Sequence, residues 1–241
     1  MYVFFHTVWL DPRRLYLTNF VLFLPVAPKT YQYGKGTLSR HDLTEQPIDQ
    51  FQKWFNQAKD EGVPLPEAVN LATAELPSGR VSSRVVLFKE LDTDGSVVVY
   101  SNWSTSKKAK DIRSNPHAAV TFFWPSLERQ VRIEGVTEFL STEESQIYFD
   151  TRPRESRIGA WASPQSQIIK SREELDTLYE EQLKRFEGQE QIPCPPFWGG
   201  LKIKPLEWEF WQGRPGRVHD RFIYTRDNVD TEEWAIHRIA S

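Results

Sequence analysis

Between residues 67 and 140, short segments with the alternating pattern of β-strands follow one another with mainly turns between them, and this feature constrains the fold most. Pro77-Ser78-Gly79 and Asp94-Gly95 interrupt the segments, and glycine and proline at such places favour the tight turns of β-hairpins. Strands joined by tight turns pair antiparallel, whereas parallel strands need a long crossover connection. We therefore predict a mostly β chain with peripheral α-helices, built on an antiparallel barrel or sandwich.

A hydrophobic period of two gives the expected positions of the strands. In residues 130–140, for example, Val131, Ile133, Thr137 and Phe139 fall on one face. The segments expected to be strands are residues 67–76, 79–91, 96–102, 117–124, 130–140 and 197–213. Because no internal repeat or Gly/Ser-rich linker divides the chain, residues 29–241 are expected to form a single domain.

Helices are expected where the hydrophobic period lengthens. Residues 47–62 place Phe51, Trp54, Phe55 and Ala58 on one helical face, and Gly62 ends the helix. The other helix signals are, in order, residues 107–116 with a stop at Asn115-Pro116, a capping-box pair at Ser141 and Glu144, Pro153 at a first helical position, and a second capping-box pair at Ser171 and Glu174.

Charge and cysteine content exclude several functional classes. The 241 residues carry a formal net charge of −3, whereas general nucleic-acid binders carry an overall basic face. The single cysteine, Cys194, allows no disulfide within the chain. The five histidines show no metal-ligand spacing, so we expect no metal site. We predict neither nucleic acid nor a membrane as a partner, and a cytoplasmic location.

Residues 1–28 differ from the rest of the chain. An apolar run at residues 15–27 follows Arg13 and Arg14, and it is too short to span a bilayer. It loosely resembles a signal peptide but has no small-residue cleavage site. We interpret residues 1–28 as an extension that is disordered or an artefact of the gene model. A targeting peptide, mitochondrial or other, and an ordered arm are the alternatives.

Cationic side chains are densest in EFWQGRPGRVHDRF, residues 209–222. This stretch contains Arg214, Arg217, His219 and Arg221. Such a local concentration of positive charge, on a chain whose net charge is negative, suits small anions such as phosphates. The nucleotide-binding motifs GxGxxG and GxxxxGK[ST] are absent from the sequence.

Two other groups of residues fit the same chemistry. Arg84 and Lys89 are an odd number of positions apart in one expected strand, so they point to opposite faces. Tyr148 and Arg152 have the i, i+4 spacing of a helix, and Ser156 lies one turn further on, so the three can face one site. From the residues alone two interpretations remain open: anion-binding groups, or charged side chains that extend from strand and helix ends into solvent.

Five segments, in this order and spacing, resemble the pyridoxine (pyridoxamine) 5'-phosphate oxidase family. They are RVVLFK (84–89), ERQVRIEGVTE (128–138), YFDTRPRESRIGAWASPQS (148–166), FWGG (197–200) and EFWQGRPGRVHDRF (209–222). The resemblance runs from about residue 30 to residue 241. It implies the family's FMN-binding split barrel, a Greek-key antiparallel β-barrel with peripheral helices, and a homodimer with FMN at the subunit interface.

The resemblance also implies roles for particular residues. FMN would be bound by Arg84, Val85, Val86, Leu87, Phe88, Lys89, Tyr100, Ser101, Lys107, Lys108, Gln130, Gln165, Ser166, Trp211 and Arg221. The substrate would be bound by Lys89, Tyr148, Arg152, Ser156, Arg217, Val218 and His219. Of these, Arg217 and His219 would be the catalytic pair, acting at the pyridine ring as orienting and electrostatic groups. Two phosphorylated ligands in one pocket would account for the many cations.

The implied activity is the oxidation of pyridoxamine 5'-phosphate and pyridoxine 5'-phosphate to pyridoxal 5'-phosphate, with O2 as acceptor and H2O2 as product. The chain departs from the family in having Lys107 where arginine is more frequent, Val218 where leucine is usual, and Ser241 where proline is usual, and none of these changes removes an implied contact. Two alternatives remain: a split-barrel flavoenzyme with another substrate, such as a phenazine-type oxidase or a flavin reductase, and a non-enzymatic binder of FMN or pyridoxal phosphate.

Overall fold

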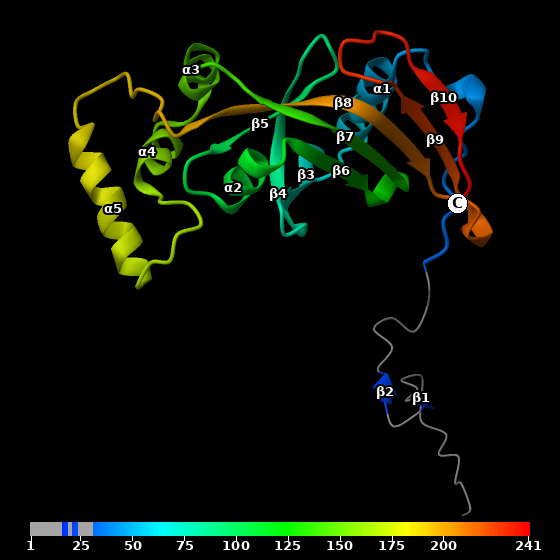
Figure 1. Cartoon of the computed structure of the whole chain (residues 1–241), viewed down its shortest axis with the longest axis horizontal. Helices are drawn as coiled ribbons and strands as arrows, with labels where there is room; N and C mark the ends of the chain where they lie inside the picture. The colour runs from blue at the N-terminus through cyan, green and yellow to red at the C-terminus, as the bar shows by residue number, and fades with distance from the viewer. Residues whose placement is uncertain (1–15, 19–20, 24–30) are drawn as a thin grey trace, which may run out of the picture.

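The structure, a computed structural model, describes residues 16–18, 21–23 and 31–241 (Figure 1). Within the N-terminal extension it describes two short strands, β1 (Tyr16–Thr18) and β2 (Val21–Phe23), which pair antiparallel. The rest of our interpretation of residues 1–28 lies outside the described residues.

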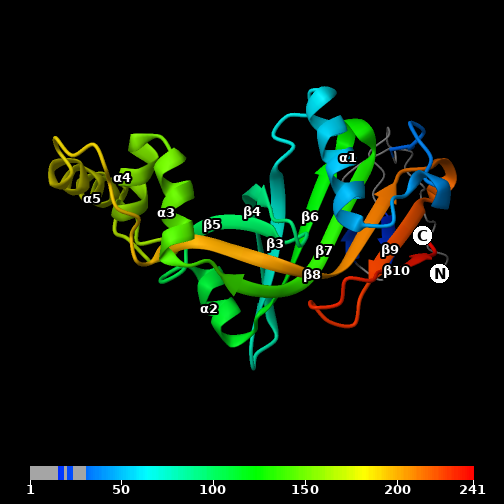
Figure 2. The same cartoon turned by 90° about the horizontal axis from the view of Figure 1, so that it is seen from above.

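The main sheet has eight strands in the order β10-β9-β8-β5-β4-β3-β6-β7, and all of its pairings are antiparallel. Because β7 also pairs with β8, the strands from β8 to β7 close into a barrel, and β9 and β10 extend the sheet beyond it (Figures 1 and 2). The strands are β3 (Ala68–Glu75), β4 (Arg80–Leu91), β5 (Val97–Asn102), β6 (His117–Trp124), β7 (Arg129–Phe139), β8 (Trp198–Gln212), β9 (Asp220–Thr225) and β10 (Ala235–Arg238). The predicted antiparallel barrel and its expected strands are confirmed.

Alternate residues of each strand fill the barrel, as a period of two requires. In β6, the buried side chains are Ala118, Val120, Phe122 and Trp124. In β7, Val131, Ile133 and Phe139 share one face as predicted, since their partners on β8 are all buried. Val131 and Ile133 are fully buried, whereas Phe139 is 45% exposed because it ends its strand, where its ring lies 5.7 Å from that of Trp103.

The first long helix, α1 (Pro47–Asp60), packs its predicted apolar face on the barrel. Phe51, Trp54 and Ala58 are buried, and the Phe51 ring lies 5.0 Å from that of Phe122. Full burial of a side chain such as Phe51 stabilises the fold by about 1.5–3 kcal/mol. Gly62 follows the helix with a φ of 69°, a left-handed conformation that suits glycine after a helix end.

Three helices, α3 (Thr142–Thr151), α4 (Arg154–Ala162) and α5 (Arg172–Arg185), lie beyond the end of the barrel that is far from β9 and β10 (Figure 1). The others are α2 (Lys107–Ser114) and the short 3-10 helices η1 (Arg40–Asp42), η2 (Pro125–Leu127) and η3 (Pro215–Arg217). A second apolar cluster, which includes Phe149, Ile158 and Phe186, connects α3, α4 and the end of α5.

Two helix and strand predictions need correction. Ser141 and Glu144 form the expected capping box, but the second pair is incomplete, because the Glu174 carboxylate accepts a hydrogen bond from Lys170 N instead of Ser171 N. The stretch 209–222, where we expected a strand only up to residue 213, comprises the end of β8, η3 and the start of β9.

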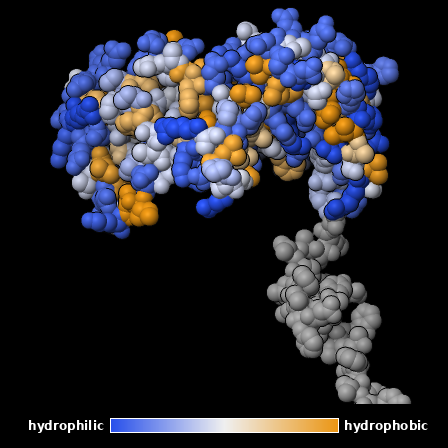
Figure 3. Space-filling view, viewed as in Figure 1, coloured by the Kyte–Doolittle hydropathy of each residue, from blue (hydrophilic) through white to orange (hydrophobic). Residues whose placement is uncertain are grey.

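The surface seen in Figure 3 is mostly hydrophilic, with apolar residues in separate groups. In the part of the chain that the structure describes, no helix is long and apolar enough to cross a membrane. The same part contains no group of three or more His, Cys, Asp or Glu side chains arranged to hold a metal ion.

Candidate functional site

A cavity of about 480 Å³ opens between β4, β5, α3 and α4, and we call it the cationic pocket. It is lined by Val86, Leu87, Lys89, Tyr100, Ser101, Tyr148, Thr151, Arg152, Pro153, Ser156, Gln165 and Trp198. Nine of these residues were expected to bind the cofactor or the substrate: Val86, Leu87, Lys89, Tyr100, Ser101, Tyr148, Arg152, Ser156 and Gln165. The structure therefore brings together residues that are up to about eighty positions apart in the sequence.

Local structure explains why these side chains converge. Tyr148 lies in the last turn of α3, Arg152 is the residue that ends it, and Ser156 is in the first turn of α4, so all three face the cavity as their spacing predicted. In β4 the exposure alternates, with Arg84 less exposed than its neighbours and Lys89 on the other face. The expected opposition of Arg84 and Lys89 is thus confirmed.

Arg152 is the most distinctive group in the cationic pocket. Its guanidinium lies 4.6 Å from the centre of the Trp198 ring, and burial lowers the pKa of Arg152. Its Nη1 atom is buried without a hydrogen-bond partner. An unsatisfied buried donor costs about 1–3 kcal/mol and a charged one more, so the pocket suits an anionic acceptor beside Arg152.

The two tyrosines of the pocket, Tyr100 and Tyr148, pack against each other. The Tyr100 and Tyr148 rings are stacked with centroids 3.9 Å apart, and the Tyr100 hydroxyl donates to Glu90 Oε1 (2.9 Å). Burial, with the Glu90 carboxylate, raises the pKa of Tyr100, and burial raises that of Tyr148. Both hydroxyls therefore remain protonated at neutral pH. Tyr100 uses its proton in the bond to Glu90, and Tyr148 can donate to a ligand.

A second cation group lies next to the pocket, where α2 meets β4. Arg84 donates to Leu71 O (3.0 Å) and to Thr73 Oγ1 (2.9 Å), and Lys108 Nζ donates to Gln165 Oε1 (2.7 Å). Burial and the nearby charge of Arg84 lower the pKa of Lys108 to about 8. A buried lysine with a lowered pKa gains from a neighbouring anion, so this group also fits a phosphate.

One carboxylate in this cation group was not predicted. Asp111 on α2 is fully buried, pairs with Lys107, and accepts from Thr73 Oγ1 (2.7 Å) and Ser82 Oγ (2.6 Å). Burial raises the pKa of Asp111, but the hydrogen bonds outweigh it and the pKa is lowered. Only the i, i+4 spacing from Lys107 hinted at this role in the sequence. Ser166, an expected FMN residue, lies in the exposed loop after α4 with a φ of 68°.

A second group of expected site residues, which we call the C-terminal half-site, comprises Gln130, Trp211, Arg217, Val218, His219 and Arg221. Of the other expected FMN residues, Phe88 is buried in the core and Val85 is exposed on β4. Strand register places Gln130 of β7 opposite Trp211 of β8, and Trp211 opposite Arg221 of β9, so the three lie in one row across the sheet. Arg221 Nε donates to Glu209 Oε1 (2.8 Å), and Glu209 is buried. Neither Glu209 nor this row was predicted, because both depend on long-range strand pairing.

The loop between β8 and β9 carries the expected catalytic pair. The His219 ring lies 4.7 Å from that of Trp211, and its Nδ1 accepts a hydrogen bond from Arg214 N (3.1 Å). Neutral His219 therefore carries its proton on Nε2. Burial and the charge of Arg217 lower the pKa of His219. Arg217 itself has a left-handed φ of 61°, and Val218 beside it is exposed.

The two groups do not meet within one chain. Trp198 lines the cationic pocket and Trp211 belongs to the C-terminal half-site, and they are thirteen residues apart on β8, roughly 40 Å along a strand. Figure 1 shows α3 and α4 beyond one end of the barrel and β9 at the other. Our expectation that residues 209–222 hold both ligands therefore cannot be met by a single chain alone.

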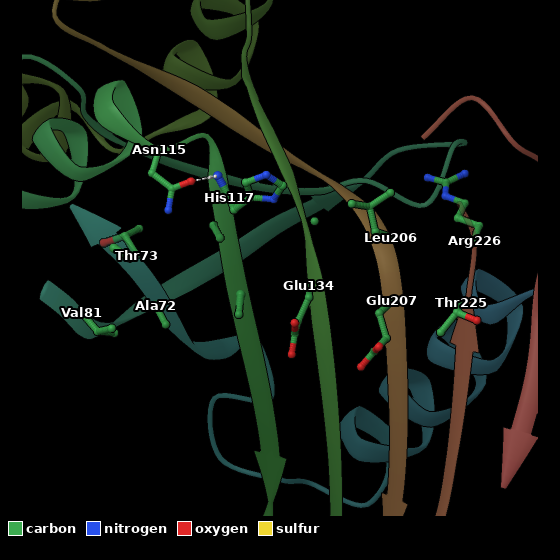
Figure 4. A pocket seen from close by; sticks show the side chains of 14 residues that line it. Ala72, Thr73, Val81, Asn115, His117, Glu134, Leu206, Glu207, Thr225 and Arg226 are labelled. Carbon is green, nitrogen blue, oxygen red and sulfur yellow. Dashed lines mark hydrogen bonds between the residues drawn. The ribbon is translucent and has the colours of Figure 1, made fainter. Parts of the chain in front are cut away.

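A second cavity contains none of the expected site residues. It has a volume of about 480 Å³ and lies on the outer face of the sheet, between Ala72, His117 and Glu207 (Figure 4). Figure 4 shows Glu134 and Glu207 pointing the same way from neighbouring strands. Burial and the nearby charge of Glu134 raise the pKa of Glu207. Its lining combines apolar side chains, the alanines and Val81, with the charged Glu134, Glu207 and Arg226.

Two parts of the chain match models of known families. Residues 55–182 match the family described as pyridoxamine 5'-phosphate oxidase, and residues 198–241 match the pyridoxine 5'-phosphate oxidase C-terminal dimerisation region. The chain is 59% identical over 215 residues to the pyridoxamine 5'-phosphate oxidase of Saccharomyces cerevisiae, which covers 89% of this chain and 93% of the yeast protein. It is 53% identical over 218 residues to the probable pyridoxamine 5'-phosphate oxidase of Schizosaccharomyces pombe, over 89% of this chain and 94% of that protein.

A solved structure agrees with the barrel. PhzG from Burkholderia lata 383, in complex with tetrahydrophenazine-1-carboxylic acid, superposes with a TM-score of 0.76 at 28% identity, covering 85% of this chain and 98% of PhzG. The sequence matches cover more than half of the chain, and the yeast protein is similar over nearly its whole length. The resemblance seen in the sequence is therefore confirmed: the chain belongs to the pyridoxamine 5'-phosphate oxidase family.

Proposed function

We propose that the protein oxidises pyridoxamine 5'-phosphate and pyridoxine 5'-phosphate to pyridoxal 5'-phosphate, using FMN and O2 and releasing H2O2. Family membership supports the reaction class. The observation that carries the proposal is the cationic pocket, where Tyr148, Arg152 and Ser156 face one cavity and Arg152 has a buried, unpartnered donor. A phosphorylated substrate supplies the acceptor that this donor lacks.

The FMN phosphate fits the cation group formed by Arg84, Lys107 and Lys108. Lys107 pairs with Asp111 and, at 4.0 Å, with Glu75, and Arg84 lies 3.9 Å from Asp111. Three cations therefore face two carboxylates, and the group keeps net positive charge for a dianion. Bound FMN would supply the hydride acceptor of the oxidation. In the proposal, Arg84 and Lys108 hold the phosphate, and Lys89, Tyr148, Arg152 and Ser156 hold the phosphate of the substrate.

Two chains are part of the proposal, and the match to a dimerisation region supports a homodimer. Phe123, 48% exposed, lies opposite Gln130 on the outer sheet face, which continues to the exposed Val85 and Leu87 of β4. We infer that this face packs on a second copy. Each cationic pocket then receives the C-terminal half-site of the partner subunit, with FMN at the interface.

In that arrangement Arg217 and His219 orient the pyridine ring. The Arg217 guanidinium offers a planar fork of donors, and His219 Nε2 offers one N–H. Alignment of the two reacting rings is the contribution expected of the protein, because the hydride moves directly between them. Closure of the pocket by the partner subunit would also exclude water from the reacting atoms.

A second candidate is a split-barrel flavoenzyme with another substrate, and the similarity to PhzG is the observation in its favour. The identity to PhzG is 28%, against 59% to the yeast oxidase, and Tyr148, Arg152 and Ser156 would have no role without a phosphorylated substrate. A cytoplasmic location is part of the first proposal and is tested by imaging the tagged full chain.

One experiment tests the function directly. The purified protein is saturated with FMN, its visible spectrum is recorded, and pyridoxamine 5'-phosphate is added without oxygen. We expect the flavin band to bleach and to return when O2 is admitted, with formation of pyridoxal 5'-phosphate. A flavin band that stays unchanged would reject the oxidase and leave two alternatives, a flavoenzyme with another substrate and a non-enzymatic binder.

A further inference from the structure

Residues 31–38, which we call the strap, run across the C-terminal half-site. The Tyr33 ring meets those of Trp211 and His219 edge-on, with centroids 5.1 Å from each. A Cβ atom added at Gly213 would come within 2.6 Å of the Tyr33 ring. Glycine at this position therefore permits the close approach of the strap to the end of β8.

A single buried carboxylate binds the middle of the strap. Glu128, at the end of η2, accepts hydrogen bonds from Tyr31 Oη (2.8 Å), Gly34 N (2.7 Å) and Lys35 N (2.8 Å). Burial raises the pKa of Glu128, but these hydrogen bonds outweigh it and the pKa is lowered, so the group is charged at neutral pH. Glu128 also has a left-handed φ of 55°, a conformation that is unfavourable for a residue with a Cβ atom.

The far end of the strap is fixed by a second carboxylate. Asp220 Oδ2 accepts from Leu38 N (3.0 Å), and Asp220 Oδ1 accepts from Arg238 Nη1 (2.7 Å). Arg238 Nη2 in turn donates to Leu38 O (3.0 Å). The strap is thus tied to β9 and β10 at one end and to the residue after η2 near the other. Tyr33 lies between Tyr31 and Gly34, which both donate to Glu128.

We propose that Glu128 is a positioning residue, which acts through the strap to seat Tyr33 against Trp211 and His219 and so shapes the C-terminal half-site. The proposal rests on the proposed function in one respect: the ligand meets Trp211 and His219. Glu128 touches neither ring, and its effect passes through Tyr33. With the strap in place, Tyr33 covers one side of the His219 ring and limits the orientations that the ring can take.

The rate of trypsin cleavage measures how firmly the strap is held, and the assay needs no ligand. Lys35 is the one basic residue of the strap, and the backbone N–H of Lys35 is bound to Glu128. In Glu128→Ala apoprotein we expect cleavage after Lys35, giving a product that begins at Gly36, to be at least about tenfold faster than in wild type, since charge-assisted hydrogen bonds to the strap are lost. Asp42→Ala is the matched control, because Asp42 accepts bonds from Ser39, just beyond the strap. It should leave this cleavage unchanged.

A double-mutant cycle tests whether the effect passes through Tyr33. We expect Glu128→Ala to raise the KM for pyridoxamine 5'-phosphate by about tenfold with a smaller change in kcat, and to raise it less than about twofold in a Tyr33→Ala background. Tyr31→Phe removes one of the three bonds and leaves Glu128 intact. It gives the same test with a smaller change if Glu128→Ala does not fold.

Equal cleavage rates at Lys35 in wild type, Glu128→Ala and Tyr31→Phe would overturn the proposal. So would KM effects of Glu128→Ala and Tyr33→Ala that add independently. A wild-type protein that does not oxidise pyridoxamine 5'-phosphate would instead reject the proposed function, and the trypsin comparison would still decide whether Glu128 holds the strap.

Discussion

The cationic pocket and the C-terminal half-site differ in how complete each is within one chain. Around the cationic pocket, Arg84, Lys108 and Gln165 contact one another or the strands beneath them, and Arg152 has a donor ready for a ligand. In the C-terminal half-site, the Gln130-Trp211-Arg221 row lies on an open sheet face next to exposed apolar side chains. The first region resembles a preformed binding site, and the second resembles one wall of a site.

This contrast indicates that the pocket mainly binds ligands and that the C-terminal half-site mainly affects the rate of the reaction. The pocket contains buried cations, which are stable only with nearby acceptors or a bound anion. In the C-terminal half-site, Arg221 is already paired with the buried Glu209 (2.8 Å), which also accepts from Arg132 (2.6 Å). Loss of a pocket cation should therefore mainly weaken ligand binding, whereas loss of a loop side chain should mainly slow the reaction.

The largest expected effect comes from the pocket. Arg152→Ala should lower kcat/KM for pyridoxamine 5'-phosphate by on the order of a hundredfold to a thousandfold, because it removes a buried charge that faces the substrate phosphate. Steady-state kinetics measure this loss. Arg157→Ala, which changes a neighbouring arginine of α4 outside the pocket lining, is the control. Comparable losses in both variants would show that the helix, and not the charge of Arg152, matters.

The next effect belongs to the C-terminal half-site. Arg217→Ala or His219→Ala should slow anaerobic flavin reduction by on the order of a hundredfold while FMN stays bound. The reason is that a displacement of the hydride donor by about an ångström slows such a reaction by that factor. Arg217→Lys should behave like Arg217→Ala, since it keeps the charge but loses the planar fork. Stopped-flow reduction per bound FMN is the measurement, with His237→Ala on β10 as control. Normal rates per flavin in both alanine variants would remove this loop from the site.

A smaller effect is expected at the phosphate end of the flavin. Arg84→Ala should weaken FMN binding by about 2 kcal/mol, roughly thirtyfold in Kd, through loss of a charge-assisted pair. Fluorescence titration of apoprotein with FMN measures the change. Arg80→Ala, at the exposed start of the same strand, should bind FMN normally. Unchanged retention in the Arg84 variant would return this residue to a purely structural role.

The smallest effect is a pH dependence. The pKa of Lys108 is about 8 in the ligand-free protein, so above that pH the lysine must take up a proton to meet the phosphate. FMN affinity should therefore fall by on the order of tenfold from about pH 7 to about pH 9.5. Lys108→Arg stays charged over this range and should flatten the curve. Parallel curves for wild type and Lys108→Arg would mean that another group titrates.

The sequence predicted best what depends on short spacings. The helical spacing of Tyr148 and Arg152 and the strand parity of Arg84 and Lys89 placed these side chains correctly, because neighbouring positions share one local geometry. The turn residues likewise indicated an antiparallel barrel before any contact was known.

Long-range pairing explains what the sequence did not reveal. The row through Trp211 depends on the registers of β7, β8 and β9. Strand β9 itself was not expected, because it begins within the cation-rich stretch 209–222. Glu128 meets the strap more than ninety positions away, and Asp111 meets β3 and β4 from α2. The resemblance to a family named Arg217 and His219, but only the structure separates them from the pocket that they are proposed to serve.

The account rests on one claim, that each complete site combines the pocket of one subunit with the C-terminal half-site of its partner. Arg152→Ala and His219→Ala chains, each nearly inactive alone, can be mixed as differently tagged subunits and allowed to exchange. In the mixed dimer, one site receives both changes and the other receives neither. Random pairing should then restore about a quarter of wild-type activity, and purified mixed dimers about half. Mixed dimers that form but stay as inactive as either parent would contradict the claim, because both half-sites would then belong to the same chain.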